Sequence, residues 1–177
     1  AARRALVIDE LRGVRVLVVD DNPSAREILI AALSAFGCEV EQAASGKQAI
    51  DQVQASIDSA HPYALVFMDW KMPTMDGIAC TTQLRERFAG ATPPVILVTA
   101  YGLDQMAQLP AALLDTVKSM VTKPVTRSTL LETLGRTLGQ TYTNPDLPTR
   151  SHHTQEQLAN DMRHLQGARV LLAEDNA

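Results

Sequence analysis

Five polar residues follow short apolar runs of the sequence, at positions where strands are expected to end. The first run, VRVLVV, leads into the adjacent carboxylates Asp20 and Asp21, and the third run ends at Asp69. The fourth and fifth runs lead into Thr99 and Lys123. Because the carboxyl ends of parallel strands meet at one edge of a sheet, we expect these side chains to converge. Carboxylates at such close quarters repel each other unless a cation compensates them, so the pattern predicts a Mg²⁺ site.

A carboxylate beside a bound cation can also act as a nucleophile toward phosphorus. Attack by Asp69 on a phosphoryl group would give an aspartyl phosphate. Such a transfer depends mainly on positioning and on neutralising the charge that spreads over the phosphoryl oxygens. Lys123 can neutralise part of that charge, the Thr99 hydroxyl can donate a hydrogen bond, and the small side chain of Ala100 leaves room for the incoming group. These residues therefore predict phosphoryl transfer to Asp69.

Alternating strand and helix patterns position these residues. Three of the apolar runs are apolar almost throughout, which is typical of parallel strands covered on both faces. The expected strands are 14–19, about 38–43, 64–68, 94–98 and 117–121. The expected helices are 24–36, 46–58, 77–88, about 103–115 and 127–138. Five β-then-α units predict an α/β fold, with a doubly wound, five-stranded parallel sheet flanked by helices.

Composition favours an acidic protein with an aliphatic core. The chain has 177 residues, of which 46% are hydrophobic and 4% aromatic, and its net charge is -4. This charge argues against nucleic acid or an anionic membrane as the main partner. No apolar stretch approaches the roughly 20 residues of a membrane-spanning helix, and the first residues have no apolar signal core. Cys38 and Cys80 are far apart, so we expect two reduced thiols in a cytoplasmic segment, whether or not a longer parent chain is anchored in a membrane.

A repeat of the first strand divides the chain into parts. The sequence LRGVRVLVVDDN at 11–22 returns as LQGARVLLAEDN at 165–176, with an acid pair at the same place. The intervening segment after Leu138 is polar, as linkers are, and the returning strand indicates the start of a second copy of the domain. We expect a linker at 1–12, a domain at 13–138, a polar linker with a short helix at 139–166, and the first strand of a truncated second domain at 167–177.

Four motifs occur in the sequence in one order: VLVVDDN, VFMDWKMPTMDGI, PVILVTAYG and VTKPV. Together they resemble the receiver domain of two-component response regulators, over residues 13–138. The resemblance implies a flavodoxin-like fold with strand order 2-1-3-4-5. It also implies Mg²⁺ as cofactor and a phosphohistidine as the phosphoryl donor, carried by a histidine kinase core or a phosphotransfer domain.

The resemblance assigns roles to the acidic residues. Asp69 matches the phosphoacceptor of the family, Asp21 its direct Mg²⁺ ligand, and Asp20 the acid that usually acts through water. Lys71 matches the residue whose backbone carbonyl completes the metal site. Gly77 matches part of the loop that shapes the exit from the third strand. The resemblance thus implies a metal site made of Asp20, Asp21, Asp69 and the carbonyl of Lys71.

Further roles concern the other strand ends. Thr99 and Lys123 match the family's hydroxyl and lysine, and the bond from Lys123 to Pro124 is cis in the family. Tyr101 matches a position that tunes phosphoryl lifetime and access, although a rim aromatic that only packs on the loop fits equally well. One position departs from the pattern: Met120 stands where the family often has an aromatic switch residue. We therefore expect any switch that couples Thr99 to that position to differ from the usual form.

Two other functions are compatible with part of this pattern of residues. A phosphohydrolase with an aspartate nucleophile needs a second acid two positions later, where this chain has Lys71. A receiver that only docks partners, without being phosphorylated, should have lost an acid or the lysine, and all are present. The sequence therefore favours the hypothesis that the domain is a phosphoacceptor. Such a receiver catalyses its own phosphorylation and dephosphorylation but is not by itself a turnover enzyme.

The surroundings of the domain suggest its parent protein. A receiver followed by a linker and a second receiver, with no DNA-binding segment, resembles the C-terminal part of a hybrid sensor histidine kinase with tandem receivers. A free-standing protein with several receivers is the alternative. The strand at 168–173 is apolar on both faces, so we expect it either to form an unstructured tail or to dock on an apolar patch, with a dimer as one outcome.

Overall fold

The structure, a computed structural model, describes residues 8–100 and 109–138. All of these belong to the first of the two units into which the chain divides, Ala1–Tyr142 and Thr143–Ala177. The strands are β1 (Arg15–Val19), β2 (Glu39–Ala43), β3 (Leu65–Asp69), β4 (Val95–Thr99) and β5 (Val117–Thr122). The α-helices are α1 (Pro23–Ala35), α2 (Gly46–Asp58), α3 (Gly77–Phe88) and α4 (Arg127–Thr137). Three short 3₁₀ helices are η1 (Ile8–Leu11), η2 (Ala89–Ala91) and η4 (Ala111–Leu113).

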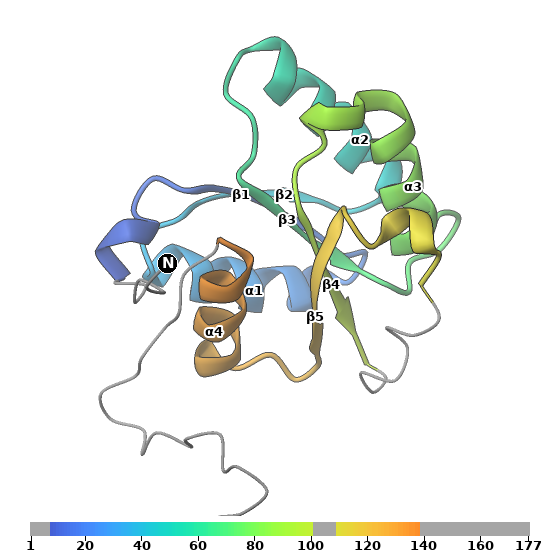
Figure 1. Cartoon of the computed structure of the whole chain (residues 1–177). Coiled ribbons are helices and arrows are strands. Elements are labelled where there is room, and N and C mark those ends of the chain that lie inside the picture. The colour runs from blue at the N-terminus through green and yellow to red at the C-terminus, as the bar shows by residue number, and fades with distance from the viewer. Residues whose placement is uncertain (1–7, 101–108, 139–177) are drawn as a thin grey trace, which may run out of the picture. The chain divides into compact units, whose positions relative to one another are not determined.

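The five strands form one parallel sheet with the order β2-β1-β3-β4-β5. Helices α2 and α3 cover one face of the sheet, and α1 and α4 cover the other (Figure 1). The predicted fold class and strand order are therefore confirmed. None of the helices in the described ranges has the length and apolar character needed to cross a membrane.

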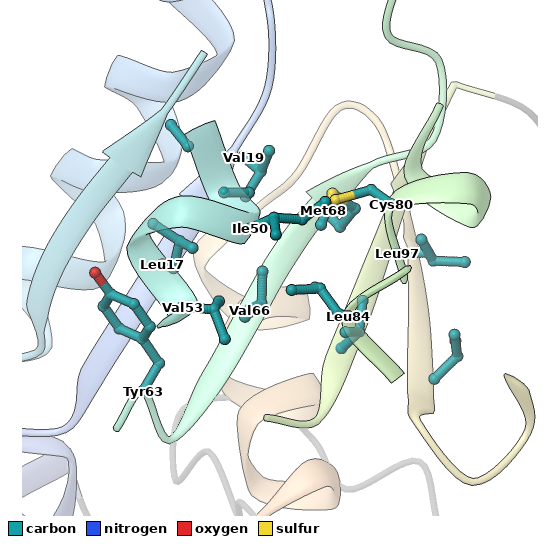
Figure 2. Packing of buried hydrophobic residues seen from close by; sticks show 14 of the residues in the cluster. Leu17, Val19, Ile50, Val53, Tyr63, Val66, Met68, Cys80, Leu84 and Leu97 are labelled. Carbon is teal, nitrogen blue, oxygen red and sulfur yellow. The ribbon is translucent and has the colours of Figure 1, made fainter. Parts of the chain in front are cut away.

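Side-chain alternation along the strands divides the core into two layers. Neighbouring residues of a strand point to opposite faces, so Leu17 and Val19 face α2 and α3, whereas Val16 and Val18 face α1 and α4. Figure 2 shows the first layer. Its labelled members are Leu17, Val19, Ile50, Val53, Tyr63, Val66, Met68, Cys80, Leu84 and Leu97. Because both faces are covered, β3 and β4 are buried along their whole length.

Sequence patterns located most elements closely. Every strand, and each of the helices α1, α2, α3 and α4, begins and ends within one residue of the expected range. The helix expected at about 103–115 falls partly on residues 101–108, which lie outside the described ranges. The rest of that range contains only the 3₁₀ helix η4.

Two features of the fold were not expected. Residues 1–12 were assigned to a linker, whereas Leu11 in η1 is completely buried in the layer that contacts α1 and α4. The other feature is a shift of register between β4 and β5: Val95 is paired with Val117, but Ile96 is paired with Ser119. Lys118 is therefore an extra residue in β5, which locally resembles a bulge.

Candidate functional site

The three carboxylates predicted to converge lie at the carboxyl edge of the sheet, at the ends of the neighbouring strands β1 and β3. Asp20 directly follows β1, and Asp69 is the last residue of β3. Because Val19 is paired with Met68, the residues that follow them, Asp20 and Asp69, lie at the same level of the sheet. Both are buried, whereas Asp21 is exposed. One oxygen from each of Asp20, Asp21 and Asp69 lies within 4.8 Å of the others. The topology thus brings together acids from two strands that are 49 positions apart in sequence (69 - 20).

Lys123 connects two of these acids. Its Nζ atom lies 2.8 Å from Oδ2 of Asp20 and 2.8 Å from Oδ1 of Asp69. The lysine reaches this position because its backbone amide donates to the carbonyl of Thr99 at 2.7 Å, where β5 ends beside β4. Burial alone would lower the pKa of Lys123, but the hydrogen bonds to Asp20 and Asp69 outweigh it and raise that pKa. Lys123 is therefore held in its charged form.

The acids remain only partly compensated. Burial raises the pKa of Asp69, the nearby charges of Asp20 and Asp21 raise it further, and the hydrogen bond from Lys123 opposes them. In the described part of the chain, no hydrogen bond or ion pair holds the carboxylate of Asp21. One ammonium thus faces three carboxylates. This excess of negative oxygen ligands fits a hard divalent cation such as Mg²⁺, which prefers carboxylate oxygens.

The hydroxyl residue also lies at this edge. Thr99 ends β4 and is buried, and the residue before it, Val98, is paired with Asp69 across the sheet. Thr99 is therefore one position beyond the phosphoacceptor candidate on the adjacent strand. Ala100 follows it and is exposed, as a position with room for an incoming group requires.

The remaining predicted residues occupy different environments. Lys71 is exposed in the loop between β3 and α3, two positions after Asp69. Met120 is buried in the layer that contacts α2 and α3, opposite Leu97 of β4. The peptide bond between Lys123 and Pro124 is cis. Tyr101 lies outside the described residues.

The loop after Asp69 is closed by Gly77. The amide of Gly77 donates to the carbonyl of Trp70 at 2.9 Å, so α3 begins close to the end of β3. A Cβ atom at Gly77 would lie 2.4 Å from the carbonyl oxygen of Asp69, which is far inside van der Waals contact. Only glycine therefore fits here without displacing the backbone of Asp69.

Two residues that the sequence analysis did not single out hold Asp20. The amide of Asn22 donates to Oδ1 of Asp20 at 2.9 Å, while the Asn22 side chain accepts hydrogen bonds from the first turn of α1 and thereby caps the helix. Nη1 of Arg26 donates to the carbonyl oxygen of Asp20 at 2.6 Å. The sequence contains a signal for the first of them, because Asn22-Pro23 is a typical helix start, whereas Arg26, next to Glu27, looks like an ordinary surface residue of a helix.

Comparison with protein families gives a match over most of the domain. The model of the response regulator receiver domain matches residues 16–135, and this range contains Asp20, Asp21, Asp69, Thr99 and Lys123.

Two relatives illustrate the range of proteins that carry this domain. The chain is 35% identical over 119 residues to the two-component response regulator ORR41 of Oryza sativa subsp. japonica, with 66% of this chain and 88% of that protein covered. It is 41% identical over 103 residues to the histidine kinase CKI1 of Arabidopsis thaliana, with 51% of this chain but only 9% of the kinase covered. The chain thus spans about a tenth of the length of this larger relative.

A solved structure of similar sequence agrees with the fold. The receiver domain of the sensor histidine kinase PA1611 from Pseudomonas aeruginosa has a TM-score of 0.60 and 28% sequence identity, with 72% of this chain and 99% of that domain covered. That receiver holds a magnesium ion coordinated in its active-site cleft. Since the family model covers well over half of the chain and the sheet has the family's strand order, the chain belongs to the receiver domains of two-component signalling.

Proposed function

We propose that the domain takes a phosphoryl group from a phosphohistidine onto Asp69 in a Mg²⁺-dependent reaction and so relays a signal. The observation that carries this proposal is the position of Lys123, whose ammonium lies 2.8 Å from both Asp20 and Asp69. A lysine placed between a metal-site acid and a nucleophilic acid can contact the phosphoryl oxygens as the new bond forms. An ordinary surface ion pair would not join two buried acids at the ends of neighbouring strands.

The acid cluster is where the cation would be held. Asp20, Asp21 and Asp69 would provide carboxylate oxygens, and Lys71 would provide its backbone carbonyl. Bound Mg²⁺ would neutralise charge on the phosphoryl oxygens. The raised pKa of Asp69 supports this assignment, because crowded and partly buried carboxylates gain from a nearby cation.

The transfer itself requires few groups of the protein. A carboxylate oxygen of Asp69 attacks phosphorus, the bond between phosphorus and the donor's imidazole nitrogen breaks, and its electron pair stays with the imidazole. Lys123 neutralises a phosphoryl oxygen, and the Thr99 hydroxyl donates a hydrogen bond to another. The small side chain of Ala100 leaves the approach open. These side chains therefore act by orientation and charge, as phosphoryl transfer requires.

The relatives of the domain support a proposal for its partners. We propose that the donor is a histidine kinase core or a phosphotransfer domain, and that the parent protein is a hybrid histidine kinase with a second receiver. The likeness to part of a histidine kinase supports this parent. The likeness to ORR41, most of which the chain covers, supports the alternative of a protein without a kinase core.

Intact-mass measurement with acetyl phosphate as a small donor tests the proposal. The wild-type chain should gain one phosphoryl group with Mg²⁺ and none with EDTA. Asp69→Asn should gain none, whereas the control Asp115→Asn, which changes an exposed acid before β5, should behave as wild type. Equal labelling of Asp69→Asn would refute the assignment. A folded wild-type chain that takes up no phosphoryl group would favour a docking module, and continuous release of phosphate at enzymatic rates would favour a phosphohydrolase.

A further inference from the structure

Arg26 lies in the first turns of α1 and contacts two strands at once. Its Nη1 atom donates to the carbonyl oxygen of Asp20, just after β1, at 2.6 Å. Its Nε atom donates to the side-chain oxygen of Gln42 in β2 at 3.0 Å. The side chain is half-buried. A guanidinium can hold two acceptors at once because its donors form a rigid, planar fork.

The backbone that carries the second acceptor is itself held by hydrogen bonds. The backbone carbonyl of Gln42 accepts a hydrogen bond from Nε2 of Gln52 in α2 at 3.0 Å. Next to it, the carbonyl of Ala43 accepts the amide of Asp20 at 3.2 Å. Arg26 therefore adds a further link between the end of β1 and the end of β2, which α2 also holds. Its side chain is therefore not an ordinary solvent-exposed side chain on the surface of α1.

The contact of Arg26 with Asp20 bears on the residue that follows. The carbonyl group of Asp20 and the amide of Asp21 belong to one planar peptide unit, so fixing that carbonyl fixes the direction in which Asp21 leaves β1. Asp21 is exposed, and no contact among the described residues restrains its carboxylate. Its position is thus set by the backbone alone.

We infer that Arg26 is a positioning residue for Asp21: it holds the peptide between Asp20 and Asp21 so that the Asp21 carboxylate points toward the other two acids. The inference deepens the proposed function and rests on it for the identity of the bound cation. It assigns a role to a side chain that is not one of the three acids and that contacts Asp20 only through the backbone carbonyl.

Whether substitution of Arg26 weakens or strengthens Mg²⁺ binding distinguishes a positioning role from an effect of its charge alone. If Arg26 acted only through its positive charge, Arg26→Gln would remove a repulsion and Mg²⁺ would bind more tightly. If Arg26 positions Asp21, both Arg26→Gln and Arg26→Lys should weaken Mg²⁺ binding about tenfold, as is typical for groups that orient metal ligands. Arg26→Lys keeps the charge and loses the fork. Arg136→Gln, which removes an exposed arginine of α4, is the matched control and should bind as wild type.

Two measurements decide the question. Mg²⁺ binding is followed by the fluorescence of Trp70, the single tryptophan, which adjoins Asp69. Hydrogen exchange without metal is measured at the amide of Asn22, which donates to Asp20, and is compared with the core amide of Val18. In both Arg26 variants, exchange at Asn22 should rise at least tenfold relative to Val18.

Each outcome bears on one claim. Unchanged or tighter Mg²⁺ binding in Arg26→Gln, or unchanged exchange at Asn22 in both variants, would overturn the positioning role. Failure of the wild-type chain to bind Mg²⁺ would instead refute the proposed function. The metal-free exchange measurement would then still show whether Arg26 holds the peptide.

Discussion

Gly77, the first residue of α3, is the position where the smallest substitution should disturb the site most. A Cβ atom there would lie 2.4 Å from the carbonyl oxygen of Asp69 and 3.1 Å from the Cα atom of Trp70. Both are backbone atoms of the segment that carries Asp69, the proposed phosphoacceptor, so no side-chain rotation can relieve the contact. Gly77→Ala must therefore move the end of β3 away from the start of α3.

The distance by which the Asp69 carbonyl must move in Gly77→Ala determines how much stability and phosphorylation rate are lost. Cβ contacts essentially never fall below 3.0 Å, so the carbonyl of Asp69 must recede by at least 0.6 Å (3.0 - 2.4). Overpacking of this kind costs about 1–3 kcal/mol, and the better helix propensity of alanine returns up to about 1 kcal/mol. We expect a net loss of about 1–2 kcal/mol in the free energy of unfolding. Since a misplacement of 1 Å can cost about a hundredfold in rate, phosphorylation of Asp69 should slow at least about tenfold.

Gly90→Ala provides the matched control, because nothing lies within 4 Å of its Cβ position. Urea unfolding followed by Trp70 fluorescence measures stability, and intact mass after timed exposure to acetyl phosphate measures the rate. Gly90→Ala should resemble the wild-type chain in both assays. If Gly77→Ala also kept wild-type stability and wild-type rate, the close approach of α3 would not position Asp69, and the reasoning from packing would be refuted.

Three further predictions concern the rest of the chain. Leu11→Ala should lower the free energy of unfolding by about 2–5 kcal/mol because Leu11 is completely buried, whereas Arg12→Ala on the exposed side of the same segment should change it little. The hydroxyl of Tyr63 donates a hydrogen bond to Glu41 at 2.6 Å and, together with Arg15, holds the pKa of Glu41 below its usual value. The hydrogen bond therefore stabilises the fold fully above about pH 4.3, the pKa of an unfolded Glu, and this stabilisation is lost as the pH falls through the lower pKa of the folded state. Because Glu41 is 48% exposed, Tyr63→Phe should cost only about 1 kcal/mol at pH 7 in urea unfolding and less at pH 3; an equal cost at both would contradict this account. Truncation after Gly139 should reduce self-association in sedimentation and lower the unfolding temperature if the strand at 168–173 docks, and identical behaviour of the two chains would exclude docking.

The parts of the structure that follow from strand pattern and topology could be predicted from the sequence. A run that is apolar on both faces must lie in a covered parallel sheet, so the ranges of β1, β3 and β4 were clear. Once the strands are parallel, their ends share one edge, and the meeting of Asp20, Asp69 and Lys123 follows without any knowledge of side-chain geometry. The convergence of the site is thus a property of the fold class.

Features that depend on individual contacts could not be predicted in this way. Arg26 has the sequence signature of an ordinary helix residue, and its role appears only when the ends of β1 and β2 are seen side by side. Leu11 is one of several apolar residues in the short segment ALVIDELRG, and nothing in the sequence shows that it is buried against the sheet. Strict alternation would place Val117 and Met120 on opposite faces of β5, yet the extra residue Lys118 turns both toward the same layer.

The long separation between Asp20 and Lys123 also affects how the protein is made. The two residues are 103 positions apart and directly follow β1 and β5, the first and last strands in chain order. A chain synthesised from its N-terminus therefore completes β1, β3 and β4 before the ammonium of Lys123 exists to compensate the acids. In that interval the carboxylates of Asp20 and Asp69 repel each other at the unfinished edge, which opposes early closure of the sheet there. The arrival of β5 completes the sheet and brings the first compensating charge to these acids in one event, so the last strand adds both sheet pairing and ion pairing at this edge.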